Sequence, residues 1–287
     1  MRSALSLALL AAICLTGAAA HAEGQPVKML FLSKSAGFEH DAIKQENGQP
    51  SVADTILTEV CKGLGIELVC TKDASLINAE NLKNYKAVIF YTTGYLTEAG
   101  SDGHPPMGEN GLKELLDWIN AGGGFFGLHS ATDSFHSKGD EVSPYIEMIG
   151  GEFETHGQQF KGALRVVSPG HPAIASLPDG WEAFEEWYIN KNLNTAKMHV
   201  LALLEVGDKT RERQPKLYNI PDYPIVWCRA YGQGRVLYNG LGHNKAVWEA
   251  DVFKKLVADN LKWVAGQGEL KADPNYDQVV PKTIGKK

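Results

Sequence analysis

Apolar runs and helical periodicities alternate along the first half of the chain. Four largely apolar segments have the length of buried strands, and they occupy residues 27–33, 66–70, 86–92 and 124–129. Between them, residues 50–64 and 110–121 carry apolar side chains at helical spacing. In the second of these segments they are Leu112, Leu115, Leu116 and Ile119. Alternating strands and helices predict right-handed crossovers and a mostly parallel sheet with helices on both faces.

The pattern changes after residue 150. Residues 160–167 and 199–206 are predicted to be strands, and residues 224–231 and 235–239 flank a Gly-Gln-Gly turn that is typical of a β-hairpin. A last amphipathic helix spans residues 247–264, after which the chain becomes polar and Lys-rich. We therefore expect one α/β domain over residues 26–266 with an appended C-terminal β-hairpin, followed by a loose polar tail over residues 267–287.

Composition and charge narrow the class of protein. Hydrophobic residues make up 44% of the 287 positions and charged residues 22%, which is ordinary for a folded globular chain. The formal net charge is −6, and no basic footprint of the kind that nucleic acid requires is visible. The sequence therefore excludes nucleic acid as the expected partner.

The N-terminus has the features of a secretory signal. Arg2 precedes an apolar run over residues 5–15, and an A-x-A cleavage pattern ends at Ala22, just before Glu23. No other apolar run reaches the length of a membrane span. We therefore expect residues 1–22 to be a signal peptide, and the mature protein to be exported, periplasmic or extracellular, without a membrane anchor.

Three cysteines would remain after cleavage, namely Cys61, Cys70 and Cys228. Cys61 and Cys70 are spaced so that they can form a disulfide across a helix-to-strand connection in an oxidising compartment. The alternative, which we favour, is that all three are small buried hydrophobic side chains.

Polar segments follow the predicted strands at the edge where open α/β sheets bind ligands. Residues 33–41, 92–95 and 129–133 follow the first, third and fourth strands, and residues 239–243 leave the hairpin. Ligands of such sheets bind outside the carboxyl ends of the strands. The side chains that these loops offer to a substrate are His40, Tyr95, His129, Ser130 and His243.

The sharpest feature is residues 127–131, Gly-Leu-His-Ser-Ala, a strand that enters a tight turn with a reactive side chain at its tip. This is the layout of a nucleophile elbow, and here the tip residue is His129. Its imidazole can act as a general base, a metal ligand or a hydrogen-bonding group for a sugar hydroxyl, or it only caps the turn. Asp133 lies four residues later, where a helix would let it orient the ring, unless it only caps that helix.

The remaining histidines form no local metal motif. No H-E-x-x-H and no CxxC pair occurs, so a divalent metal ion would have to be held by side chains from distant loops. The candidate ligands are His40, His129, His156 and His243, of which His156 belongs to no predicted element.

Two adjacent carboxylates precede two aromatic residues at Glu185, Glu186, Trp187 and Tyr188. Carboxylates beside aromatic rings suit sugar binding and general acid–base catalysis. Only one of two neighbouring side chains on a strand can face a pocket, and a solvated acidic turn is the alternative. We expect Glu186 at the rim of the histidine pocket.

These segments together resemble the ThuA-like, or trehalose-utilisation, family. The matching motifs lie, in the family's order and spacing, at residues 37–43, 123–131, 149–156, 171–178, 185–188, 224–227, 231–236 and 241–243. The resemblance covers residues 27–264. It implies a class I glutamine-amidotransferase-like fold, that is, a flavodoxin-like, doubly wound sheet.

The resemblance also implies a function in carbohydrate utilisation, with an oxidised sugar as the expected substrate. His129 stands where the amidotransferases carry their nucleophilic Cys, so glutamine amidotransferase activity is not expected. We expect an enzyme of hydrolase, lyase or isomerase type that acts on a sugar, keto-sugar or glycoside; the alternative is a non-catalytic carbohydrate-binding module. The expected catalytic residues are His129, Glu186 and Asp133. The expected substrate-binding residues are His40, Tyr95, Ser130, His156, Tyr188 and His243.

Overall fold

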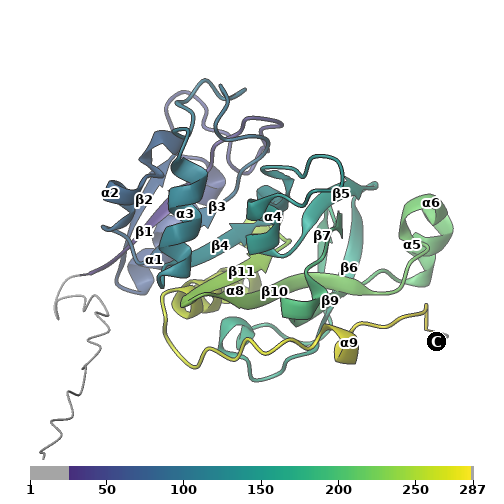
Figure 1. The fold of residues 1–287 in the computed structure, drawn as a ribbon. Coiled ribbons are helices and arrows are strands. Elements are labelled where there is room, and N and C mark those ends of the chain that lie inside the picture. The colour runs from purple at the N-terminus through teal and green to yellow at the C-terminus, as the bar shows by residue number, and fades with distance from the viewer. Residues whose placement is uncertain (1–25, 286–287) are drawn as a thin grey trace, which may run out of the picture.

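A computed structural model describes residues 26–285 of the protein. The predicted signal peptide, residues 1–22, lies outside these described residues. The described chain forms a nine-stranded sheet in the order β2-β1-β3-β4-β11-β10-β9-β6-β7, together with a two-stranded sheet of β5 and β8 (Figure 1).

The first five strands in this order run parallel to one another. They are β2 (Ile66–Thr71), β1 (Val27–Leu32), β3 (Ala87–Phe90), β4 (Gly124–Leu128) and β11 (Gly234–Asn239). Taken in chain order, their arrangement is 2-1-3-4-5, which is the flavodoxin-like order. The predicted α/β, flavodoxin-like fold class is therefore confirmed.

Helices cover both faces of this parallel half, because alternate residues of its strands are apolar on both sides. Met29 and Phe31 of β1 pack with α1 (Val52–Gly63) and α8 (Asp251–Val264) on one face. Leu30 and Leu32 pack with α3 (Gly111–Asn120) and α4 (Pro144–Ile149) on the other, in front of the sheet in Figure 1. The short helix α2 (Ala79–Leu82) lies beside α3.

The predicted hairpin is present, and it is built into the sheet rather than attached at its edge. β10 (Tyr223–Tyr231) pairs with β11, which itself pairs with β4. Three further antiparallel strands, β9 (His199–Glu205), β6 (Phe160–Val166) and β7 (Trp181–Glu185), extend the sheet beyond β10. The short helices α5 (Asp208–Arg213) and α6 (Pro215–Tyr218) follow β9. The fold is thus a parallel half joined to an antiparallel half.

Two boundaries differ from the sequence predictions. His156 was expected outside regular structure, but it ends β5 (Glu152–His156), where it lies opposite Tyr188 of β8 (Tyr188–Lys191). The predicted final helix is interrupted at Ala250, whose backbone is extended, so that α7 (Lys245–Glu249) precedes α8. Both differences arise because pairing and packing with distant segments override local pattern.

The predicted polar C-terminal tail contacts the domain at several points. His171 Nε2 bonds to the carbonyl of Lys271, and the side chain of Asn275 accepts the backbone N–H of Val200. The tail then forms α9 (Tyr276–Val279), which packs against the core with its apolar side chains. The polar composition of the tail does not predict these contacts, because backbone carbonyls, the side chain of Asn275 and one short helix supply them.

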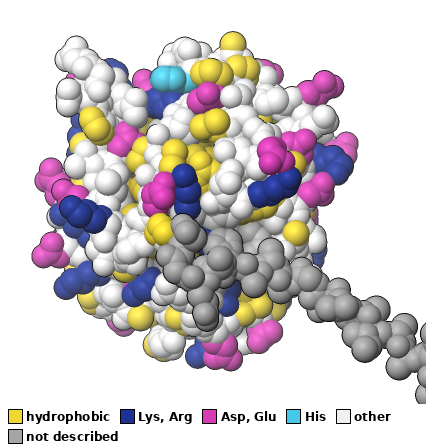
Figure 2. Space-filling view, turned by 90° about the vertical axis from the view of Figure 1, so that its left-hand side faces the viewer, with side chains coloured by type: hydrophobic (Ala, Val, Ile, Leu, Met, Phe, Trp, Pro, Cys, Tyr) yellow, Lys and Arg dark blue, Asp and Glu magenta, His cyan; other side chains and the backbone are white. Residues whose placement is uncertain are grey.

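The cysteines of the described residues are unpaired, and charges of both signs share the face shown in Figure 2. On the face shown in Figure 2, acidic and basic side chains are interspersed and no broad basic patch gathers. Within residues 26–285, no helix is both long and apolar enough to cross a membrane. All three cysteines in this range are free thiols, with Cys61 and Cys228 buried and Cys70 partly buried.

Candidate functional site

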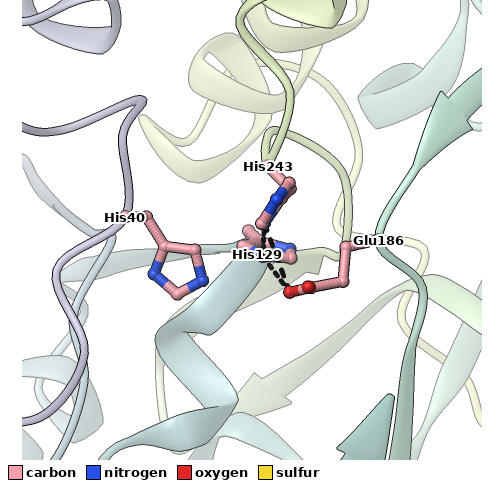
Figure 3. A group of neighbouring side chains, drawn as sticks. All are labelled: His40, His129, Glu186 and His243. Atoms are coloured by element: carbon pink, nitrogen blue, oxygen red, sulfur yellow. Dashed lines mark hydrogen bonds and ion pairs between the residues drawn. The ribbon is translucent and has the colours of Figure 1, made fainter. Parts of the chain in front are cut away.

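Four side chains from four separate segments converge at the carboxyl edge of the sheet (Figure 3). His40 comes from the loop after β1, His129 from the turn after β4, and His243 from the loop after β11. Glu186 lies in the two-residue connection between β7 and β8. The parallel half therefore supplies three imidazoles, and the antiparallel half supplies the carboxylate.

His129 occupies the tip of a strained turn. Its φ angle is 41°, in the left-handed region that non-glycine residues rarely adopt, and its side chain is fully buried. Gly127 makes room for the turn, because a Cβ there would lie 2.9 Å from Ile149 Cδ1 and 3.1 Å from Ala131 Cβ. His129 Nδ1 lies 3.2 Å from the carbonyl oxygen of Gly240, which leaves Nε2 directed toward Glu186. The sharp turn expected from the sequence is present, with imidazole at its tip.

The carboxylate of Glu186 is shared by three imidazoles. Oε2 lies 3.6 Å from His129 Nε2 and 3.2 Å from His243 Nδ1, and Oε1 lies 3.2 Å from His156 Nδ1. Burial acts to raise the pKa of Glu186, but the neighbouring imidazoles of His129 and His243 outweigh it and hold that pKa well below its usual range. Glu186 is therefore a carboxylate at neutral pH.

The neighbouring Glu185, the last residue of β7, has a different task. It is fully buried and accepts the backbone N–H of Gly242 at 2.9 Å and that of Asn244 at 3.3 Å. Burial raises the pKa of Glu185 to about 7, against the opposing effect of the Gly242 hydrogen bond. Glu185 thus fixes the loop that presents His243, a role that sequence reasoning did not find.

Burial also determines the protonation of the histidines. Burial and the nearby imidazoles of His129 and His243 lower the pKa of His40 to about 2. Burial likewise lowers the pKa of His129, despite the opposing effect of the nearby Glu186 carboxylate. Burial acts in the same direction on His243, but Glu186 outweighs it and raises that pKa. At neutral pH, His40 and His129 are therefore neutral imidazoles with a free lone pair each.

Aromatic side chains wall the cluster. The ring of Tyr188 lies 4.4 Å from that of His129, and its hydroxyl is 3.3 Å from His40 Nε2. His156 stacks on the other side of Tyr188 at 5.8 Å. Phe38, with 67% of its surface exposed, places its ring edge-on to His40 at 4.9 Å. The cluster thus combines polar groups with flat apolar surfaces.

Two buried lysines hold the loop that carries His40 and Phe38. Lys34 Nζ is fully buried and lies 3.1 Å from a carboxylate oxygen of Asp102. Lys72 Nζ donates to the carbonyl of Ser33 at 2.9 Å and pairs with Glu39 at 3.0 Å. Because neither lysine belongs to a recognisable motif, only the fold reveals that they position the site.

Three predicted residues do not join the cluster. Asp133 bonds to His136 Nε2 at 2.7 Å instead of orienting His129, whose ring is held by the carbonyl of Gly240. The predicted pairing is wrong because His129–Asp133 is a 3₁₀ helix, in which residues four apart do not share a face. Tyr95 donates to the backbone carbonyl of His136, and Ser130 is buried with no hydrogen-bond partner for Oγ among the described residues.

The cluster has the donor set of a metal site. One ligand atom from each of His40, His129, Glu186 and His243 lies within 4.8 Å of the other three. The set differs from the predicted one, because Glu186 belongs to it and His156 does not. His156 instead contacts the outer oxygen of Glu186 and is exposed on one side.

One known protein family matches this sequence over most of its length. A family model described as ThuA, trehalose utilisation, covers residues 28–264. This protein belongs to the ThuA family. The resemblance expected from the motifs is thereby confirmed, and the ThuA region includes all four residues of the cluster.

Solved structures share the ThuA fold. A ThuA-like protein from Bacteroides uniformis is 21% identical, with 90% of this chain and 99% of that chain covered and a TM-score of 0.64. A ThuA-like protein from Parabacteroides merdae is 18% identical, with 91% and 95% covered and a TM-score of 0.60. The cytoplasmic protein STM1381 from Salmonella typhimurium is 12% identical, with 83% and 99% covered and a TM-score of 0.54. No curated protein matches the chain.

Proposed function

We propose that this ThuA protein is a carbohydrate-processing enzyme whose active site is the cluster of His40, His129, His243 and Glu186. The observation that carries the proposal is the position of Glu186, an ionised carboxylate shared by imidazoles at the carboxyl edge of a flavodoxin-like sheet. Substrates of such folds bind at this edge. The substrate class is a sugar, keto-sugar or glycoside, in keeping with the family's description as trehalose utilisation.

The chemistry of the cluster suits a neutral polyhydroxylated substrate. Imidazoles and a carboxylate accept and donate hydrogen bonds to hydroxyl groups, and they transfer protons next to a sugar carbonyl. Tyr188 and Phe38 add flat apolar surfaces beside them. Sites of this kind, apolar walls with few convergent polar groups, are typical of small-molecule pockets.

Amidotransferase chemistry does not fit the cluster. The tip of the turn after β4 carries His129 rather than a nucleophilic thiol. The free cysteines of the described chain lie elsewhere in the fold, and burial raises the pKa of Cys61 and of Cys70 to about 12. Thiols in this state are poor nucleophiles.

A second candidate is a carbohydrate-binding module without turnover. The specific observation in its favour is the direct pairing of Glu186 with imidazoles, which occupies groups that an acid–base mechanism needs free. Under this alternative the pocket binds sugar and releases it unchanged.

We also propose that the protein works outside the cytoplasm, after removal of residues 1–22, on the strength of the N-terminal pattern.

The test is a panel of trehalose, glucose, a β-linked disaccharide and their keto derivatives. Calorimetry measures binding, and NMR of the sugar measures product. We expect the parent chain to bind and convert at least one member, and Glu186→Gln to lose conversion while the fold is retained. His104→Ala is the matched control, because that side chain is exposed and makes no contact with the cluster. Binding without product supports the module, and no binding to any member contradicts both candidates.

A further inference from the structure

We propose that His129, His243 and Glu186 bind one divalent transition-metal ion, with His40 within reach as a fourth ligand. The proposal deepens the proposed function, because it rests on the same cluster and names the group that would act on the sugar. The argument for the ion, however, comes from the geometry and charge of the cluster and does not depend on which sugar binds.

The spacing of the ligand atoms matches one face of a small coordination polyhedron. Zinc–nitrogen bonds of about 2.0–2.1 Å in a tetrahedron place neighbouring ligand atoms about 3.3 Å apart. Here His129 Nε2 and His243 Nδ1 are separated by 3.3 Å. Glu186 Oε2 lies 3.2 Å from His243 Nδ1 and 3.6 Å from His129 Nε2. The three atoms therefore form a nearly equilateral triangle of the size that one ion requires.

Glu186 brings a negative charge into a largely buried cluster of side chains. Glu186 is largely buried, and within the part of the chain that the structure describes its ion pairs are with histidines, not with lysine or arginine. A buried carboxylate is ordinarily paired with a full positive charge or bound to a metal. No lysine or arginine among the described residues supplies that charge to Glu186. A divalent cation between the three ligands would supply it.

The outer contacts orient the ligands toward a common point. His129 Nδ1 donates to the carbonyl of Gly240, which leaves the lone pair of Nε2 for a metal, as ligating histidines ordinarily do. His40 Nδ1 is buried and has no partner among residues 26–285. The side-chain nitrogen of Gln159 lies 2.9 Å from His243 Nε2, and its oxygen accepts from the side chain of Asn244. For Nδ1 to bind a metal, Nε2 must carry the proton, which requires the Gln159 amide to turn its oxygen toward the ring.

The ligand set is that of a catalytic rather than a structural site. Structural zinc sites close their coordination with four protein ligands, commonly cysteines, whereas catalytic sites keep a position open. Two histidines and a carboxylate on one face leave a fourth position open, and when His40 also binds, a fifth position remains for a substrate oxygen. When bound, the ion would polarise a hydroxyl or carbonyl oxygen of the sugar as a Lewis acid. His156 and Tyr188 lie beside the ligands and would contact the same substrate.

The experiment measures metal binding directly. The mature chain is stripped with EDTA, dialysed, and loaded separately with Zn²⁺, Co²⁺ and Mn²⁺. Metal analysis gives the stoichiometry, competition with a chelator gives the Kd, and the visible spectrum of Co²⁺ reports the coordination number. We expect one ion per chain and a loss of affinity of at least about 100-fold in Glu186→Gln and His243→Ala, because each removes a ligand rather than an outer contact.

Two controls make the result specific to the cluster. His104→Ala removes an exposed histidine, and His156→Ala removes a histidine that touches Glu186 without belonging to the ligand set. Both should still bind one ion, with an affinity within about tenfold of the parent, the lower end of the effect of an outer contact. Glu186→Gln is nearly isosteric, and circular dichroism verifies that it folds.

The outcomes separate this inference from the proposed function. A parent chain that binds no ion at micromolar concentration, or ligand variants that bind like the parent, overturns the metal site. Stripped protein that converts sugar at the rate of loaded protein overturns the part of the ion in the reaction, while supporting the proposed function. One ion per chain without binding of any sugar supports the metal site and contradicts the proposed function.

Discussion

Removal of the buried Lys34 charge should loosen the loop that carries His40 without touching His40 itself. Lys34 Nζ bonds to Asp102 at 3.1 Å and to the carbonyl oxygen of His104 at 2.8 Å. The side chains of both members of the ion pair are almost completely buried. We expect Lys34→Met, which keeps the length and most of the volume of the side chain, to destabilise the protein.

The size of the effect follows from what Asp102 retains. Breaking a buried ion pair by removing one partner costs about 3–5 kcal/mol. Asp102 keeps two backbone donors, from Ser35 at 2.7 Å and from His104 at 3.0 Å, so we expect the lower limit of about 3 kcal/mol. For a chain of this size, that corresponds to a fall in Tm of about 6–12 °C.

Urea unfolding of Lys34→Met, Asp102→Asn and the double variant tests this reasoning. The double variant leaves no unpaired buried charge, so its loss of stability should be smaller than the sum of the two single losses by at least about 1 kcal/mol. Metal and sugar affinity, measured on the same proteins, should fall with the displacement of His40. A single-variant loss below about 1 kcal/mol, or strict additivity in the double variant, would refute a stabilising ion pair.

Four further predictions use other features. Gly94→Ala should cost at least about 2 kcal/mol in urea unfolding, because φ is 75° and the new Cβ would lie 2.8 Å from the backbone of the loop carrying Phe38; a smaller loss contradicts the close approach. Phe38→Leu should leave the free energy of unfolding within about 0.5 kcal/mol of the parent but weaken sugar binding in calorimetry; unchanged affinity excludes stacking. Asp133 and Glu152 raise the pKa of His136 above its unfolded value, so this stabilisation is complete below an unfolded pKa of about 6.5 and is lost as pH rises through the folded pKa. In His136→Gln, the free energy of unfolding should no longer fall in this way when unfolding curves are measured from acidic to alkaline pH. If it depends on pH as steeply as in the parent, the stabilising pair is excluded. N-terminal sequencing of the exported protein should begin near Glu23, whereas an intact Met1 contradicts cleavage.

The parallel half of the fold was predictable because its signals are local. Each of its strands is a largely apolar segment and each long helix has a clear periodicity, so that the alternation of elements and the handedness of the crossovers follow from general rules. The same rules place the loops of His40 and His129 at one edge of the sheet. The turn at His129 could be predicted from the Gly-Leu-His-Ser-Ala sequence at residues 127–131. The ring centroids of His40 and His129 are 4.9 Å apart.

The antiparallel half and its contribution to the site were less predictable. β5 and β8 are short strands that exist through their pairing with each other, so their sequences carry little signal on their own. Glu185 accepts hydrogen bonds from the loop after β11, whereas Glu186 faces the histidines. The local sequence does not show which of the two carboxylates takes which orientation. The buried lysines under the His40 loop are polar residues at core positions, which a hydrophobic pattern places on the surface.

The position of β11 has a consequence for synthesis of the chain. β11 pairs with β4 in the middle of the sheet, yet more than a hundred residues separate them, as the 114-residue interval between His129 and His243 illustrates. A nascent chain that ends before Gly234 therefore leaves the edge of β4 unpaired, and exposed strand edges recruit other strands. The ribosome must deliver nearly the whole domain before that edge closes and His243 arrives.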